Sequence, residues 1–155
     1  GQGTLTFLNG SIYEGSWKDD LANGAGVIRF NNGDVYEGEW IDSHAHGDGT
    51  FTSSNGLVYK GQFRNGFFSG SGKLIYTNNT TYEGQWNKNF ANGNGTFVTR
   101  DGIIYSGTFK EGKINYSGSV TYATNQDYTQ KGELFYRHGI DMESISLLRG
   151  ELFEK

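Results

Sequence analysis

Two histidines separated by a single residue are the first feature of this chain that could carry chemistry. Imidazole nitrogens are common zinc ligands, so His44 and His46 would supply two ligands of a metal site. We expect the two side chains to point to opposite sides of an extended segment, and no third ligand lies at a suitable spacing nearby. The sequence therefore predicts no metal site, and we interpret His46-Gly47 as a structural pair.

A glycine-rich segment that ends in lysine, residues 70–73, looks like part of a phosphate-binding loop. The complete motif needs glycine at position 67 and serine or threonine at position 74, where this chain has Phe67 and Leu74. Single glutamates recur at intervals of 23 residues or more, too far apart for two carboxylates to share one pocket. They are Glu14, Glu37 and Glu83, with Asp19-Asp20 nearby in the chain. We predict no catalytic residues and no cofactor, and hence a protein that is not an enzyme.

Six tyrosines stand 23 residues apart, a spacing typical of a stacked array of similar units. They are Tyr13, Tyr36, Tyr59, Tyr82, Tyr105 and Tyr128. Each of the first five is followed by glycine at the second position and by tryptophan or phenylalanine at the fourth. A second pattern with the same 23-residue period places a glycine two residues before an apolar residue, as in Gly49 and Phe51. The chain starts within this pattern, so we expect it to begin inside a unit.

Alternation of residue types within each unit predicts two β-strands and two turns. Tyr36, Gly38 and Trp40 share one face of the first strand, because successive side chains of a strand point to opposite faces. The chain has 25 glycines and no proline, so every backbone amide is available for a sheet. We predict an all-β fold, namely a single-layer, twisted antiparallel β-hairpin repeat array with about five full repeats plus partial units.

The turn between successive units decides which faces coincide. Its last position holds only the two residue types that tolerate a left-handed backbone. These are Gly10, Gly33, Gly56, Asn79, Gly102 and Asn125. A three-residue loop closed by such a residue would pair Ile28 with Tyr36 and Gly26 with Gly38. Aromatic, aliphatic and glycine residues would then share one face.

The connection within a unit is expected to be six residues long. Spanning residues 18–23, it would place Trp17 opposite Gly24 and Tyr13 opposite Ile28. The glycines then leave hollows in which neighbouring tyrosine and tryptophan rings can lie.

These residues resemble the MORN repeat. Tyr-Glu-Gly-x-Trp, then about six residues, then Gly-x-Gly-x-apolar and Asn-Gly, recur at a 23-residue step; the likeness is fullest in residues 13–26, 36–49 and 82–95 and covers about residues 1–122. Lys60 and Ser106 replace the glutamate in two units. The resemblance implies roles in cytoskeletal scaffolding, membrane-contact architecture and homodimerisation, and modules beside a kinase or methyltransferase domain.

Near the end of the chain the pattern departs from the repeat. Gln130 occupies a glycine column, and residues 131–135 and 149–153 echo each other. Terminal units of a stacked array are expected to be atypical because they end a sheet. We predict a repeat array over residues 1–127 and a degenerate terminal repeat with a capping segment over residues 128–155. An oligomer contact and a linker to a further domain are the alternatives for this segment.

Charge and composition restrict the classes of partner. The net charge is -4 and the 13 basic residues are scattered singly, which argues against nucleic acid and gives no polybasic patch for anionic lipid. The sequence has no cysteine, and within these residues we expect neither a signal peptide nor an apolar run of roughly 18 residues that could span a membrane. We expect an intracellular, cytoplasmic protein that associates with the cytoskeleton or with membranes.

The aromatic face is the remaining candidate for function. Most of its columns are expected to form the core, but a single twisted sheet cannot bury both faces, so ring edges would line a long concave groove. The variable residues Leu21, His44, Phe67, Phe68 and Phe90 are expected to be partly exposed along it. The candidate groove residues are Tyr36, Trp40, Tyr59, Phe63, Phe67, Phe68, Tyr82, Trp86, Phe90 and Tyr105.

The resulting hypothesis is a non-catalytic protein–protein interaction scaffold whose groove accepts a protein or peptide segment. One alternative is a peripheral phospholipid-binding module. Another is a targeting or accessory module of a larger enzyme whose catalytic domain lies outside these residues. Carbohydrate-binding hairpin repeats also use glycine and aromatic residues, but their spacing differs.

Overall fold

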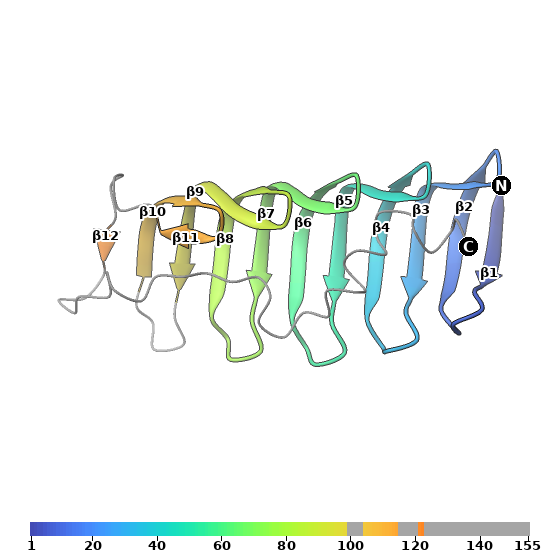
Figure 1. The fold of residues 1–155 in the computed structure, drawn as a ribbon, viewed down its shortest axis with the longest axis horizontal. Helices are drawn as coiled ribbons and strands as arrows, with labels where there is room; N and C mark the ends of the chain where they lie inside the picture. Colours follow the sequence, from blue (N-terminus) through green and yellow to red (C-terminus); the bar gives the residue numbers. More distant parts are fainter. Residues whose placement is uncertain (99–103, 115–120, 123–155) are drawn as a thin grey trace.

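The computed structural model describes residues 1–98, 104–114 and 121–122, which form one antiparallel sheet of twelve strands (Figure 1). Strands β1 to β11 lie side by side in chain order, and β12 pairs with β10. The strands are β1 (Gln2–Thr6), β2 (Ile12–Lys18), β3 (Leu21–Arg29), β4 (Val35–Ile41), β5 (His44–Thr52), β6 (Val58–Arg64), β7 (Phe67–Ile75), β8 (Thr81–Asn87), β9 (Phe90–Val98), β10 (Ile104–Lys110), β11 (Lys113–Ile114) and β12 (Thr121–Tyr122).

The predicted all-β hairpin array is confirmed. No helix in the described ranges is long and apolar enough to cross a membrane. The boundary predicted at residue 127 and the capping segment lie outside the described residues.

The three-residue turn between units forms as the glycine and asparagine column predicts. The amide of Phe30 donates to the carbonyl of Asp34 at 2.8 Å, and Gly33 closes the loop with a φ of 96°. Asn79 has a φ of 68° at the equivalent position. Ile28 consequently pairs with Tyr36, and the aromatic, aliphatic and glycine columns share one face, which we call the inner face.

The expected six-residue connection within a unit is wrong. Lys18 pairs with Leu21, so only two residues form the turn, and Trp17 lies opposite Ala22 rather than Gly24. Both turn residues have positive φ, the geometry whose twist matches that of the flanking strands. A register shift between Gly15 and Trp17 absorbs the extra residues of β3. The signal for this turn was Asn65-Gly66, a sequence typical of two-residue hairpins, which stands at the same place in the third unit.

The register shift bends strands β3, β5, β7 and β9. The first residues of each of these strands therefore pass over the inner face. At the bend, Gly24, Gly47, Gly70 and Gly93 all have positive φ. The two-residue turns therefore line one long edge of the ribbon, and the three-residue turns line the other (Figure 1). Hydrogen bonds join neighbouring two-residue turns: the amide of Ser43 donates to the Ala22 carbonyl at 2.9 Å, and that of Gly66 to the Ala45 carbonyl at 2.8 Å. This edge is thus fixed from repeat to repeat.

Paired glycines form a continuous row across the sheet, with Gly26 opposite Gly38 and Gly49 opposite Gly61. A tyrosine ring extends along its strand and covers this row. A Cβ atom added at Gly49 would lie 2.5 Å from the Tyr36 hydroxyl oxygen and 2.6 Å from a ring carbon. The predicted hollows are therefore real, and they are filled by the tyrosines.

The tryptophan or phenylalanine that stands four residues after each tyrosine is matched in volume to the residue opposite it on the next strand. Trp40 pairs with Ala45, and the two other tryptophans also pair with alanine. Where the ring is the smaller Phe63, its partner is the larger Phe68. The two positions share one fixed space, because interiors are packed to a nearly constant density.

We expect Gly49→Ala to lower the free energy of unfolding by about 3 kcal/mol, because the new methyl group would overlap the buried Tyr36 ring. Gly56→Asn is the matched control: no atom lies within 4 Å of an added Cβ, and Asn79 already occupies the equivalent turn position. Urea unfolding measures both variants. Equal stability of the two would show that the ring does not depend on the glycine.

The matched pairs predict compensation in a double-mutant cycle. Phe63→Trp should lower stability by roughly 2 kcal/mol through overpacking, and Phe68→Ala by roughly 3 kcal/mol through the cavity it leaves. The double variant reproduces the Trp40–Ala45 arrangement and should lose at least about 1 kcal/mol less than the sum. Additive losses in chemical denaturation would contradict the shared-volume account.

Candidate functional site

The inner face is a closed network of rings and backbone hydrogen bonds. The hydroxyl of Tyr36 donates to the carbonyl of Glu39 at 2.8 Å, and the indole N–H of Trp40 donates to the carbonyl of Gly26 at 3.1 Å. Tyr36 also meets Trp40 edge-on, with ring centroids 5.2 Å apart. The bonds and the edge contact recur in the repeat of Tyr82. Each ring satisfies its polar atom on the protein's own backbone.

Most of the predicted groove residues are buried in this network. Tyr36, Trp40, Tyr59, Phe63, Phe68, Tyr82 and Trp86 expose at most 5% of their surface. Phe68, which was expected to be partly exposed, is fully buried and stacks on Tyr59 with ring centroids 3.8 Å apart. These seven rings form the core and leave no open aromatic groove of their own. The side chain of Tyr105 lies outside the described part of the structure.

Two of the predicted residues, Phe67 and Phe90, keep partial exposure. Both are the first residue of a strand after a two-residue turn. We call the residues that flank these turns the rim. They form the pairs Lys18–Leu21, Ile41–His44, Arg64–Phe67, Asn87–Phe90 and Lys110–Lys113. Strand alternation places the rim pairs on the other side of the strands from the inner-face pairs beside them, and Phe90 also packs against the core.

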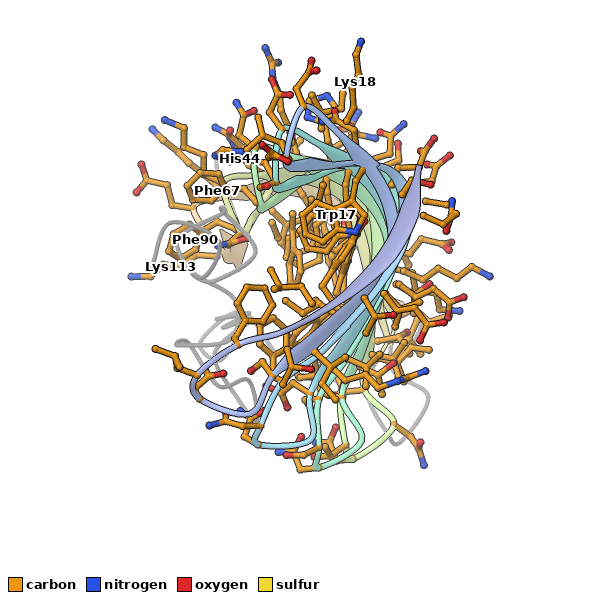
Figure 2. The ribbon with its side chains drawn as sticks, turned by 90° about the vertical axis from the view of Figure 1, so that its right-hand side faces the viewer. Trp17, Lys18, His44, Phe67, Phe90 and Lys113 are labelled. Carbon is orange, nitrogen blue, oxygen red and sulfur yellow. The ribbon has the colours of Figure 1, made fainter. Side chains whose placement is uncertain are left out.

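The rim runs along the whole described array. Figure 2 shows His44, Phe67, Phe90 and Lys113 one after another along one side of the ribbon, apart from Trp17 on the inner side. Each position is one repeat, or two strands, beyond the last, which corresponds to about 10 Å. The sequence had indicated Phe67 and Phe90 as groove residues; the bend of the strands places them on this rim instead.

The family model of the MORN repeat matches five consecutive segments of the chain, residues 13–35, 36–58, 59–81, 82–103 and 105–125. The chain belongs to the MORN-repeat family. The match covers most of the chain and confirms the resemblance drawn from the tyrosine and glycine columns. No curated protein matches the chain closely enough to count as a relative. MORN repeats are a non-catalytic repeat type that generally binds proteins or lipids.

The two histidines of the second MORN repeat lie close to backbone groups of neighbouring turns. His44 and His46 lie on the same side of β5, because residues two apart in a strand share a face, so the expectation of opposite sides is wrong. Each ring meets the backbone instead: His44 Nδ1 lies 2.8 Å from the Asp42 carbonyl, and His46 Nδ1 accepts from the Asn65 amide at 3.4 Å. No group of three metal-binding side chains occurs within the described ranges.

The other residues considered as candidates for chemistry are not gathered at one site of the MORN sheet: Gly72 lies in the inner-face glycine row, whereas Lys73 is exposed on the outer face. Residues 70–73 are part of β7, and no helix follows them within the described ranges, so they lack the context of a phosphate-binding loop. Glu14, Glu37 and Glu83 are exposed on the outer face, as the repeat spacing predicts. They are single charges on different strands.

Sequence reasoning missed a shallow hollow on the outer face of the third and fourth MORN repeats. Val58, Lys60, Lys73, Ile75 and Glu83 are among the residues that line it. Lys60 and Lys73 pair directly across β6 and β7, an arrangement of like charges that normally costs stability. The predicted register, with Tyr13 opposite Ile28, already implies this pairing when it is repeated in the third unit, but the hollow itself was not predicted.

Burial changes the acid–base behaviour of the repeat tyrosines. It raises the pKa of Tyr13 to about 12. Desolvation also raises the pKa of Tyr36, Tyr59 and Tyr82 well above the usual value of a tyrosine, because the phenolate would be removed from water. These hydroxyls are therefore neutral hydrogen-bond donors at physiological pH.

We expect the stabilising contribution of the raised tyrosine pKa values to be complete up to about pH 9 and to fall as the pH rises above about 10. The tyrosines ionise there in the unfolded chain but not in the folded chain, so the unfolded state gains the free energy of ionisation. Tyr36→Phe should lower stability at neutral pH, through loss of the bond to Glu39, but should make the alkaline fall less steep. Chemical denaturation at several pH values measures both effects. An unchanged slope would show that Tyr36 ionises in the folded state.

Proposed function

We propose that this MORN array is a non-catalytic protein–protein interaction scaffold inside the cell, and that its partner docks on the rim. The observation that carries the proposal is the partial exposure of Phe67 and Phe90 next to a core that is otherwise closed. Partly exposed aromatic side chains on a rigid support are frequent anchors of protein interfaces. The rim, unlike the inner face, presents them without opening the core.

The regular edge suits an elongated partner. Successive rim positions are fixed by the hydrogen bonds between neighbouring turns, so a partner meets a preformed surface and pays little for ordering it. Leu21 and Ile41 extend the apolar part of the rim toward the first repeats, with 39% and 50% of their surfaces exposed. A peptide segment lying along the array could contact several repeats at once. Such a scaffold would serve the cytoskeletal or membrane-associated assemblies expected from the sequence.

A random peptide library displayed on phage tests the proposal, with the described protein immobilised as bait. We expect enriched peptides to bind the unmodified protein and to bind Phe67→Ser and Phe90→Ser about tenfold or more weakly, because the anchors are lost. Val58→Ser is the control, since it removes a partly exposed apolar side chain from the outer face. Thermal unfolding checks that each variant is folded. Peptides that bind the Phe67→Ser variant as well as the unmodified protein would count against the rim.

A further inference from the structure

The rim carries opposite charges at its two ends. Around the first two turns the exposed acidic residues outnumber the basic ones; these are Asp19, Asp20 and Asp42 against Lys18. Around the last three turns the balance reverses, and the exposed residues are Arg64, Lys88, Lys110 and Lys113 against Glu111. The repeat therefore places these four basic residues, which are scattered singly in the sequence, along one half of one edge.

The aromatic side chains of the rim lie in this basic half. Phe67 pairs directly with Arg64, and Phe90 follows Lys88 by two residues. Among the described residues, the side chains of Arg64 and Lys88 make no hydrogen bond or ion pair, so their charges are not neutralised within the sheet. Cationic groups beside apolar rings favour a ligand that combines carboxylates with apolar side chains.

The spacing of these groups fits a regular peptide. Neighbouring repeats place equivalent rim residues about 10 Å apart, since each repeat adds two strands. Three residues of an extended chain or seven residues of an α-helix cover about the same distance. A peptide with acidic and apolar residues at either interval would meet the same chemistry at each repeat.

We propose that the basic half of the rim, formed by Arg64, Phe67, Lys88, Phe90 and Lys110, binds acidic peptide segments that carry apolar anchor residues. The carboxylates lie against the three cationic side chains, and the anchors pack on the two phenyl rings. This inference rests on the proposed function, because it takes the rim as the docking surface and adds the chemistry of the partner.

The geometry favours a peptide over a membrane surface. The turns next to the phenyl rings are Asn65-Gly66 and Lys88-Asn89, and Asn89 is buried. They carry no apolar side chain that could enter the acyl region of a bilayer, which interfacial anchors require. The rings themselves are only partly exposed, and Phe90 packs against the core.

Two pairs of fluorescent synthetic peptides provide the test. In the extended pair, each peptide has about 12 residues, long enough to span three repeats; one repeats Leu-Glu-Glu, and the other carries lysine in place of every glutamate. The helical pair differs in the same way but has leucine at every seventh residue. Anisotropy titrations are done at about 0.15 M salt, where exposed charges more than about 8 Å apart are largely screened. We expect at least one acidic peptide to bind about tenfold or more tightly than its basic counterpart.

Charge-reversal variants locate the binding. Arg64→Glu with Lys88→Glu should weaken the acidic peptide about tenfold or more, whereas Lys60→Glu with Lys73→Glu, the same change of charge on the outer face, should leave the affinity within about twofold. Arg64→Gln with Lys88→Gln repeats the test without adding negative charge. Equal losses in the rim and outer-face variants, or tight binding of the basic peptide, would overturn the inference. So would rim-dependent binding to phosphatidylserine vesicles without binding of either acidic peptide.

The phage selection separates this inference from the function on which it rests. If enriched peptides depend on Phe67 but are not rich in aspartate and glutamate, the rim remains a docking surface and the acidic partner is wrong. If no enriched peptide depends on Phe67 or Phe90, the proposed function itself fails.

Discussion

The tyrosine ring lying over a pair of facing glycines is the contact on which the rest of this structure depends. It lets a single sheet form a core, because the ring packs directly on the backbone instead of on a second layer. It also fixes register, since a Cβ atom at one glycine would overlap the ring and a Cβ atom at the other would overlap the facing backbone. The hydroxyl then reaches a carbonyl three residues along its own strand, as Tyr59 does to Gln62 at 2.8 Å, so burial of the polar atom is compensated.

The two-residue turn with its bend is the second device of each repeat. It carries the start of the following strand over the rings and links to the turn of the neighbouring repeat, as Asn89 does through its amide to the Phe68 carbonyl. The volume exchange between Trp40–Ala45 and Phe63–Phe68 shows how tightly the enclosed space is determined. The aromatic side chains of the inner face are buried in this core, so accessible apolar side chains are found at the rim instead.

Small sequence differences between repeats change the charge and the apolar character of the side chains from one end of the rim to the other. The column that holds Leu21 in one repeat holds His44, Phe67, Phe90 and Lys113 in the following ones. None of these substitutions affects the ring-on-glycine contact, so the fold tolerates them. A repeat protein can therefore vary its surface chemistry from unit to unit on an unchanged scaffold. The proposed docking surface is of this kind.

The sequence by itself determined the repeat, the inner face and the three-residue turn, because strand alternation and the left-handed residue at Gly33 are local properties of the chain. It also indicated Phe67 and Phe90 as functional candidates. Only the tertiary structure decided that Trp17 pairs with Ala22 and that Phe68 is core. The physical reason is that accessibility and pairing after a bulge depend on neighbouring strands and repeats, whereas turn chemistry depends on a few adjacent residues.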